Sequence, residues 1–400
     1  MSIRLGRIAS AVVIVLVLAV VAVACGDDPT PTPRATSTPT PAGPTATPTL
    51  VGPVTVGGVA RVSEADFANV YVPQLRRSMQ ALYEKAIADE GGEVVVWEFA
   101  DVPPAEKAAF AAAFPGMTIT SRGLGPESVA VVLQAISAGA PTTDVYNDGI
   151  DGTDVLRERG LYDESIDWLA LGVPPESLVA GRPGMISTRT LTYEIWYNSD
   201  CGINRDDIPT DPFDFLQPQW KGKLTGSNIF VPLGFSFYGL KYGEDRMVEL
   251  VSRLITEDIL LVTETPQRLV LTCERPILMP ANRGLLGPYA LGASVDAKAY
   301  DGMGRFDGIR GVLKDSPHPN GARLFMLWES FDPDWRDLQF SDPNIEIPTM
   351  HLSLPRSEEN PNIREILAGA EKGWVAVMDQ NNAEQREAFV GRLFGVVANP

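Results

Sequence analysis

Acidic side chains stand at the ends of three predicted strands, where they could contact a ligand. Glu98 and Asp101 come at the end of the first strand, and Glu127 opens the helix after the second. Asp148 and Asp151 follow the third strand. A pair of carboxylates can act as acid and base in a hydrolase. Together these acids favour binding of a cationic, zwitterionic or polyol-like solute.

Further side chains of the same loops complete the predicted ligand edge. Phe99 closes the first strand, and Gly125 and Ser128 flank Glu127 in the second loop. Free N–H groups at a helix start bind anions, but a carboxylate such as Glu127 already complements the helix dipole there and repels an anion. Glu127 is therefore either a ligand residue or a simple acid at a helix start. Aromatic rings such as Phe99 and Tyr238 could stack on a ligand or its cation.

An alternation of helices and strands positions these loops. Residues 75–89 carry apolar side chains at three- and four-residue steps, which predicts an amphipathic helix. The sequence then predicts strands at 93–99, 117–121 and 143–146, and helices at 103–114, 127–138 and 154–159. This order predicts a parallel sheet that is covered on both faces, with ligand groups at the carboxyl ends of its strands.

The N-terminal residues predict export and lipidation. Arg4 and Arg7 precede an apolar run over 8–23, and small residues lead up to Cys25, which is the order of a secretory signal. The segment Ala22-Val23-Ala24-Cys25 resembles the bacterial lipobox, which implies a signal peptide over 1–24 and a lipid on Cys25. The alternative is an uncleaved anchor helix, for which the apolar run is short. Either interpretation places the protein outside the cytoplasm.

A tether follows the predicted cleavage site, over residues 25–60. Residues 29–50 contain 7 Pro and 8 Thr, a composition that favours extended polyproline II conformation over a packed core. We therefore expect a domain that faces the periplasm or the cell exterior and is held at the membrane through the bilayer lipid on Cys25.

Charge and length limit the class of protein. The net charge is −18 and becomes −20 without residues 1–24, which hold two arginines and no acid. Nucleic-acid binding requires basic patches, so it is not expected. About 340 residues follow the tether, too many for one hydrophobic core, which predicts two lobes.

Cysteine and histidine are scarce, which argues against a metal site built from these residues. After Cys25, only Cys201 and Cys273 remain, and they either pair in an oxidising compartment or stay as buried thiols. The two histidines, His318 and His351, form no cluster with metal-ligand spacing. His318 precedes Pro319 at an expected helix start, and His351 has no evident partner.

Several segments, in order, resemble the iron(III)-type extracellular solute-binding proteins of bacterial ABC importers. A last helix over 381–395 also resembles that family. The matching segments are Leu82–Trp97, Phe114–Gly116, Thr143–Val145, Ile195–Asn198, Trp220–Leu224 and Ser316–Phe325.

The resemblance implies a fold of class α/β, the two-lobed type II periplasmic-binding-protein fold, with hinge strands and a ligand cleft between the lobes. The first lobe would span 61–193 and the second 194–300. Residues 301–335 would return to the first lobe, and 336–400 would form a helical C-terminal appendix.

The resemblance also suggests cleft residues in the second lobe, namely Tyr197, Asn228, Tyr238 and Tyr289. Iron-binding members of the family use an adjacent pair of tyrosines, which this chain lacks. An organic solute is therefore preferred to iron(III).

Enzyme motifs are absent from the sequence. Gly234–Tyr238 lacks the final glycine of a nucleophile elbow, and Gly123-Leu124-Gly125 lacks the third glycine of a dinucleotide site. We expect no catalysis and no cofactor, but a solute receptor that delivers its ligand to a membrane permease and its ATPase. The alternatives are a tethered sensor of the same fold, an iron(III)-binding protein, or a hydrolase that uses carboxylates.

Overall fold

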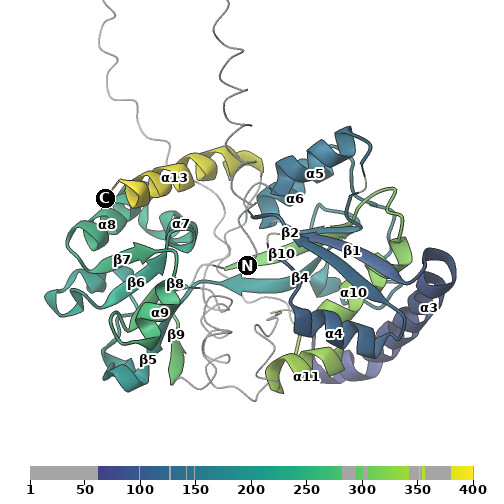
Figure 1. Cartoon of the computed structure of the whole chain (residues 1–400), viewed down its shortest axis with the longest axis horizontal. Helices are drawn as coiled ribbons and strands as arrows, with labels where there is room; N and C mark the ends of the chain where they lie inside the picture. Colours follow the sequence, from purple (N-terminus) through teal and green to yellow (C-terminus); the bar gives the residue numbers. More distant parts are fainter. Residues whose placement is uncertain are drawn as a thin grey trace, which may run out of the picture. The chain divides into compact units, whose positions relative to one another are not determined.

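The computed structural model describes two five-stranded sheets with helices packed against them (Figure 1). The described residues are 62–98, 100–125, 128–140, 142–147, 149–281, 294–300, 305–341, 351, 354–355 and 380–399. Within these ranges, no helix combines the length and apolar character needed to cross a membrane.

The first sheet has the strand order β2-β1-β3-β10-β4. Strands β1, β2 and β3 run parallel, and β10 runs antiparallel to both β3 and β4. The carboxyl ends of β1, β3 and β4 therefore lie at the same edge of this sheet. The strands are β1 (Glu93–Glu98), β2 (Thr118–Gly123), β3 (Val145–Asn147), β4 (Met185–Thr192) and β10 (Arg305–Val312).

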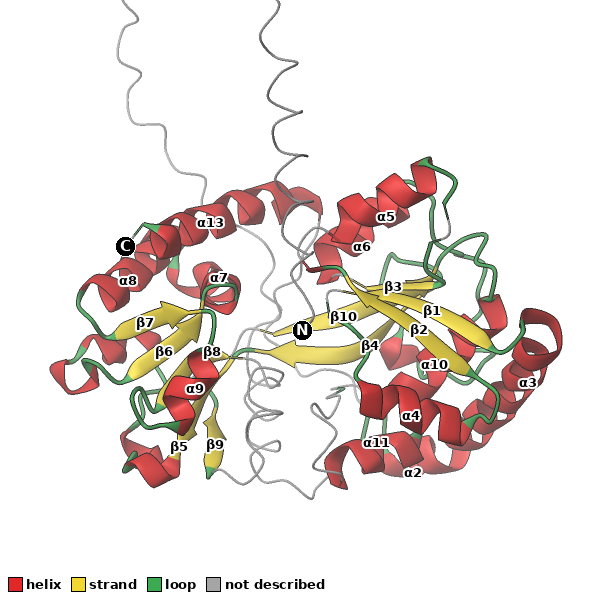
Figure 2. Ribbon diagram, viewed as in Figure 1, coloured by secondary structure: helices red, strands yellow, loops and turns green. Residues whose placement is uncertain are grey.

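Helices cover both faces of the first sheet (Figure 2). On one face, Val94 and Val96 of β1 pack with Phe110 and Phe325 in a buried core. On the other face, Tyr146 packs with residues from the helices that follow β2 and β3. The first face carries α3 (Val72–Glu90), α4 (Pro104–Ala113) and α10 (Pro319–Phe331), and the second α5 (Ser128–Ser137) and α6 (Gly149–Glu158).

Short elements extend this part of the chain. The segments α2 (Glu64–Asp66) and η1 (Phe67–Tyr71) lead into α3, η3 (Pro175–Ser177) precedes β4, and α11 (Pro333–Ser341) follows α10.

The start of α10 is fixed by a carboxylate from a distant helix. Glu90, the last residue of α3, accepts hydrogen bonds from the backbone N–H groups of Asn320 and Gly321, each with a shortest distance of 2.9 Å. Helix starts expose N–H groups that need such acceptors. The contact holds α10 against α3 and so positions the residues further along α10.

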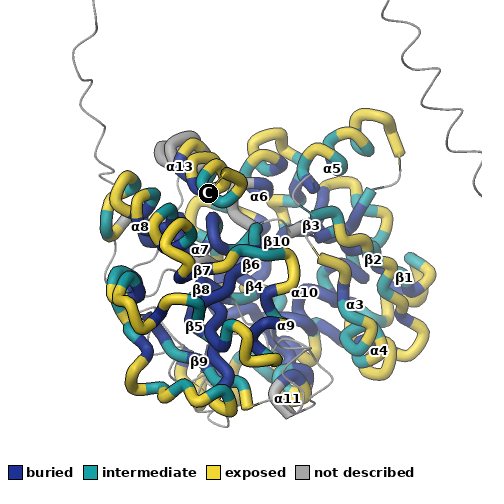
Figure 3. Tube along the Cα trace, turned by 60° about the vertical axis from the view of Figure 1, so that its left-hand side comes forward, coloured by how far each residue is buried: buried dark blue, intermediate teal, exposed yellow. Residues whose placement is uncertain are grey.

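The second sheet has the order β7-β6-β8-β5-β9, and its central strands are buried (Figure 3). Helix α13 packs on α7, where a Cβ added at Gly239 would overlap the ring of Phe389. The elements are β5 (Glu194–Asn198), β6 (Leu224–Ser227), β7 (Leu260–Thr263), β8 (Ile277–Ala281), β9 (Val295–Lys298), α7 (Phe230–Tyr242), α8 (Glu244–Thr256), α9 (Pro266–Leu271) and α13 (Gln380–Ala398), with short turns η4 (Ser199–Cys201), η5 (Arg205–Asp207), η6 (Pro212–Leu216) and η7 (Pro218–Trp220).

The chain crosses between the sheets twice. It leaves the first sheet at Thr192, the end of β4, and enters the second at Glu194, so Tyr193 alone separates the two strands. It returns between Lys298, the end of β9, and Arg305, the start of β10. Two sheets joined by two strand connections are the arrangement that the family resemblance implies.

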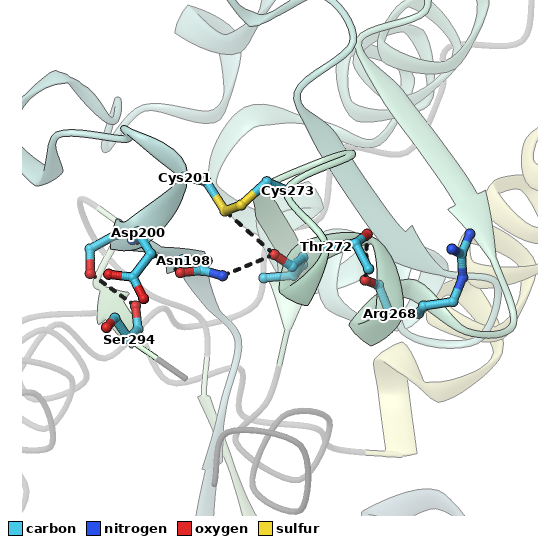
Figure 4. Close-up of a disulfide and its surroundings, with 9 residues drawn as sticks. Asn198, Asp200, Cys201, Arg268, Thr272, Cys273 and Ser294 are labelled. Carbon is cyan, nitrogen blue, oxygen red and sulfur yellow. Dashed lines mark hydrogen bonds between the residues drawn. A yellow bond between two sulfur atoms is a disulfide. The ribbon is translucent and has the colours of Figure 1, made fainter. Parts of the chain in front are cut away.

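A disulfide links two segments beside the second sheet that are distant in the sequence (Figure 4). Cys201 ends η4, just after β5, and Cys273 follows α9, at a sequence separation of 72. The carbonyl oxygen of Val270, in α9, accepts a hydrogen bond from the side-chain amide of Asn198 at 3.2 Å. The bridge therefore adds a covalent link where α9 already contacts the end of β5.

Most predicted elements agree with the structure. The helix at 75–89, the strand at 93–99 and the last helix correspond to α3, β1 and α13. Helix α6 begins at Gly149, five residues before the predicted start, and so includes the loop that was expected after the third strand.

Candidate ligand-binding site

Buried charges gather at the carboxyl edge of the first sheet. Arg310, on β10, lies between two carboxylates: its Nη2 is 2.6 Å from Oε1 of Glu98, and its Nη1 is 2.5 Å from Oε2 of Glu329. Each of the three residues is less than a tenth exposed. Glu98 ends β1 on the face that also carries Val94 and Val96, which is the face covered by α10.

A bulge in β4 turns a second guanidinium toward the same face. Arg310 pairs with Ile186, whereas Gly308 pairs with Arg189, and the register shifts between Gly308 and Ile309. Because paired residues share a face and Gly308 lies two positions from Arg310, Arg189 is on the face of Arg310. Simple alternation along β4 from Ile186 would have placed it on the opposite face.

Gly308 makes room for the side chain of Arg189. A Cβ at Gly308 would lie 2.8 Å from Cγ and 3.2 Å from Nε of Arg189. Arg189 is half-buried, and its Nε has no hydrogen-bond partner among the described residues. The strand thus holds a guanidinium whose hydrogen-bonding capacity is not used by the neighbouring described residues.

Glu106, in the first turn of α4, is the third carboxylate of the cluster. Burial raises its pKa to about 8, and the negative charges of Glu329 and Glu98 act in the same direction. The cations Arg310 and Arg189 oppose this increase in pKa. Within the described part of the chain, Glu106 has no hydrogen bond or ion pair in the structure, although it is only partly exposed.

The cluster therefore has a paired part and an unpaired part. Glu98 and Glu329 both form ion pairs with Arg310, although Nε of Arg310 has no hydrogen-bond partner among the described residues. Glu106 and Arg189 carry opposite charges when both are ionised, lie close enough to affect each other electrostatically, and are not paired with each other. Such an arrangement can bind charged groups of a solute. Among the described residues there is no group of three or more His, Cys, Asp or Glu side chains that could hold a metal ion.

The ligand residues predicted at the first sheet lie in different surroundings. Glu98 is in the cluster. Asp101 is exposed and contacts Lys107 at 3.5 Å. Ser128 is fully buried and accepts a hydrogen bond from the hydroxyl of Tyr146 at 3.0 Å, which corrects the expectation that it faces a ligand. Gly125 has a left-handed backbone, with φ of 63°.

Other predicted residues cannot be placed in the cluster. Asp151 lies in α6, and its side chain is outside the described residues. The following residues also lie outside the described ranges: Cys25, Phe99, Glu127, Asp148 and Tyr289.

Two tyrosines that were expected in the cleft are core residues of the second sheet. Tyr197 is 2% exposed and donates its hydroxyl to Asp296 at 2.7 Å. Burial, together with Asp296, raises its pKa. Tyr238 is completely buried against other aromatic rings. Their rings fill the core because β5 and α7 turn them inward. Asn228, by contrast, follows β6 and is half-buried.

Both described histidines have structural contacts. His318 precedes α10, as expected, and its Nδ1 donates to Asp144 at 2.9 Å. His351 was expected to lack a partner, but its Nε2 lies 2.7 Å from the carbonyl oxygen of Ser187 and therefore donates to it. Burial lowers the pKa of His351 to about 4.

A pocket of about 410 Å³ is lined by residues of α3, α4, α10 and α11 and by none of the residues of the cluster. In its lining Arg76 pairs with Asp334 at 3.0 Å and Trp328 stacks on Trp335, and the indole N–H of Trp335 has no hydrogen-bond partner among the described residues. The charged cluster, in contrast, contains two ionisable side chains, Glu106 and Arg189, that have no partner among the described residues.

Sequence reasoning missed four members of the cluster: Glu106, Arg189, Arg310 and Glu329. One usable signal was a charged residue within a short apolar run, as in Ile309-Arg310-Gly311-Val312. The bulge that orients Arg189 leaves no comparable mark in the sequence.

Comparisons with known proteins identify the fold. No family model and no curated protein matches the chain. Among solved structures, it is similar to the substrate-binding protein of an ABC transporter from Agrobacterium tumefaciens, with a TM-score of 0.60 and 14% identity over 78% of this chain and 95% of that one. Iron-bound HitA from Pseudomonas aeruginosa gives 0.55 and 16% over 75% and 99%.

A third similar structure is the spermidine/putrescine ABC transporter substrate-binding protein PotD from Streptococcus pneumoniae. It gives a TM-score of 0.55 at 14% identity, over 76% of this chain and 99% of that one. At these identities the similarity establishes the fold alone. The expected two-lobed type II periplasmic-binding-protein fold is confirmed.

Proposed function

We propose that this chain is an extracytoplasmic solute-binding lipoprotein that captures a small solute in an interlobe cleft and delivers it to an ABC-type importer. The observation that carries the proposal is the topology of two sheets joined by two strand connections, which matches transport proteins over nearly their whole length. ATP hydrolysis would belong to a partner ATPase, and the permease would receive the closed, loaded form.

Capture would use the charged edge of the first sheet. In open α/β sheets, ligands bind beyond the carboxyl ends of the strands, where Glu98 and its neighbours gather. Solute binding would favour a closed state in which both lobes contact the solute, with the crossings at Tyr193 and after Lys298 absorbing the motion. Asn228 remains the candidate contact from the second lobe.

The N-terminal residues are the basis for the proposed location of the protein at the membrane. Cleavage before Cys25 and its lipidation would hold the protein at the cell membrane, facing the periplasm or the exterior, with 25–60 as tether. Replacing Cys25 with Ala should move the protein from the membrane fraction to the soluble extracytoplasmic fraction. A Cys25→Ala variant that stays in the membrane would favour an uncleaved anchor helix.

The solute is proposed to be organic. HitA was solved with iron, and PotD is named for spermidine and putrescine, so the fold accommodates quite different ligands. The absence of adjacent tyrosines in this sequence disfavours iron(III), and the carboxylates of the cluster favour a cationic or zwitterionic solute.

A thermal-shift screen of the full chain tests the proposal. The panel would contain metals, polyamines, amino acids, sugars and vitamins. A ligand at 100 times its Kd stabilises a folded protein by about 2.7 kcal/mol, so a binder should raise the Tm by several degrees. No shift from any class would contradict solute capture.

A further inference from the structure

Glu106 and Arg189 can carry opposite charges but do not pair with each other, so a ligand with two opposite charges could bind both. We infer that the solute is a zwitterion whose ammonium group binds Glu106 and whose acidic group binds Arg189, an inference that rests on the proposed function.

The first support is the state of the two side chains. Both are partly exposed, and neither has a hydrogen bond or an ion pair with a described residue. Arg310, the other guanidinium, is less available because two carboxylates hold it. A partly buried charge without a partner is costly, and a ligand of opposite charge removes that cost.

The second support is that the backbone of β4 and β10 fixes the position of the Arg189 side chain. The bulge at Thr188 turns its side chain to the face of Arg310, and Gly308 leaves the space that the side chain occupies. The hydroxyl of Thr188 donates to the carbonyl of Gly308 at 3.2 Å, which fixes the bulge. The side chain of Arg189 is thus held beside the strand on which Arg310 stands.

The third support is the balance of charge. Glu98, Arg310 and Glu329 carry a net charge of about −1, and Arg189 balances it. With Glu106 protonated the cluster is neutral, and with Glu106 ionised it has one excess negative charge. When a zwitterion binds and Glu106 releases its proton, the loaded cluster keeps that one negative charge, and the two charged groups of the zwitterion give Glu106 and Arg189 each a partner of opposite charge.

This geometry links solute binding to proton release. The charged groups that act on Glu106 are Glu329 from α10, Arg310 from β10, Glu98 from β1 and Arg189 from β4, and the pKa of its carboxyl is about 8. An ammonium group binds the ionised form, so affinity rises with pH until that pKa is reached. From pH 6 to pH 8 we expect affinity to rise by roughly one to two orders of magnitude, with net release of protons on binding at pH 7.

Matched compounds test the inference on the full chain. Each proteinogenic amino acid, glycine betaine and carnitine is compared, where the derivative exists, with its amide, which lacks the carboxylate, and its N-acetyl form, which lacks the ammonium. We expect at least one zwitterion to bind, and its two derivatives to bind roughly 10- to 100-fold more weakly by titration calorimetry. Derivatives that bind as tightly as the parent overturn the inference.

Isosteric variants add an independent test with the same compounds. Glu106→Gln and Arg189→Gln should each weaken binding of the zwitterion by about tenfold or more, and Glu106→Gln should abolish the proton release. The matched control is Arg268→Gln, which changes an exposed ion pair with Glu274 and should leave affinity unchanged. Unchanged affinity in both Glu106→Gln and Arg189→Gln also overturns the inference.

The screen separates this inference from the proposed function. If a polyamine, sugar or metal binds and no zwitterion does, the solute class is wrong while solute capture stands. If no compound of any class binds, the proposed function fails as well. If binding of a zwitterion is independent of pH between 6 and 8, Glu106 is not its partner.

Discussion

Replacing Arg310 with Met should strongly destabilise the fold, in a manner that depends on pH. The change leaves Glu98 and Glu329 without the cation that lies within 2.6 Å of both. Breaking a buried ion pair by removing one partner costs about 3–5 kcal/mol. We expect a loss of about 4 kcal/mol of unfolding free energy at pH 8.

At lower pH the loss should shrink. Without Arg310, burial without a counter-charge raises the pKa values of the two carboxyls of the variant above those in its unfolded chain, so the folded variant takes up protons that its unfolded chain does not. A carboxyl whose pKa is raised on folding costs stability above its unfolded pKa, near pH 4.3, and this cost falls as the pH is lowered. Each group recovers up to about 1.4 kcal/mol per pH unit while it titrates.

Urea unfolding at pH 8 and pH 5, followed by tryptophan fluorescence and circular dichroism, measures both effects. The control Arg268→Met removes an exposed pair with Glu274 and should change stability by less than about 1 kcal/mol at either pH. A loss below about 1 kcal/mol for Arg310→Met, or a loss that is equal at both pH values, would refute the buried cluster.

Three further changes test other parts of the structure. Reducing the disulfide between Cys201 and Cys273 opens a loop of 72 residues, so calorimetry in reductant should show a loss of about 4 kcal/mol, and an unchanged Tm would contradict the bridge. Because the pKa of His351 is about 4 in the fold, the unfolded chain binds more protons than the folded protein between pH 6.5 and 4. Stability should fall by about 3 kcal/mol over that interval, and His351→Gln should flatten the dependence; equal slopes would contradict its burial. Gly308→Ala should displace Arg189 and weaken solute binding about tenfold in calorimetry, and unchanged affinity would contradict the close approach.

A matched glycine provides the control for Gly308→Ala. Gly391 lies in α13, where an added Cβ meets no atom within 4 Å. Gly391→Ala should leave solute affinity unchanged and stabilise the helix by up to about 1 kcal/mol, because alanine has the higher helix propensity.

The regular elements could be predicted because their patterns are local. The three- and four-residue spacing of Leu75, Met79 and Leu82 identified α3, and the run Val94–Val96 identified β1. Alternation of such elements led to the correct fold class. None of these inferences required knowledge of contacts between distant residues.

The cluster could not be predicted because it depends on distant contacts. Glu98, Arg189 and Arg310 come from three strands that are far apart in the sequence, and a bulge determines the direction of Arg189. Conversely, Tyr197 and Tyr238 were expected among the cleft residues of the second lobe, and the ring of Tyr238 was expected to stack on a ligand. Their orientation into the core is decided by packing of β5 and α7.

Native mass spectrometry of the full chain, purified gently in detergent, tests solute capture most directly. If the protein captures a solute, we expect a bound small molecule in one-to-one ratio, released on denaturation and replaced by a compound that raises the Tm. A clean mass without any small molecule, both after purification and after incubation with the full panel of solutes, would contradict it.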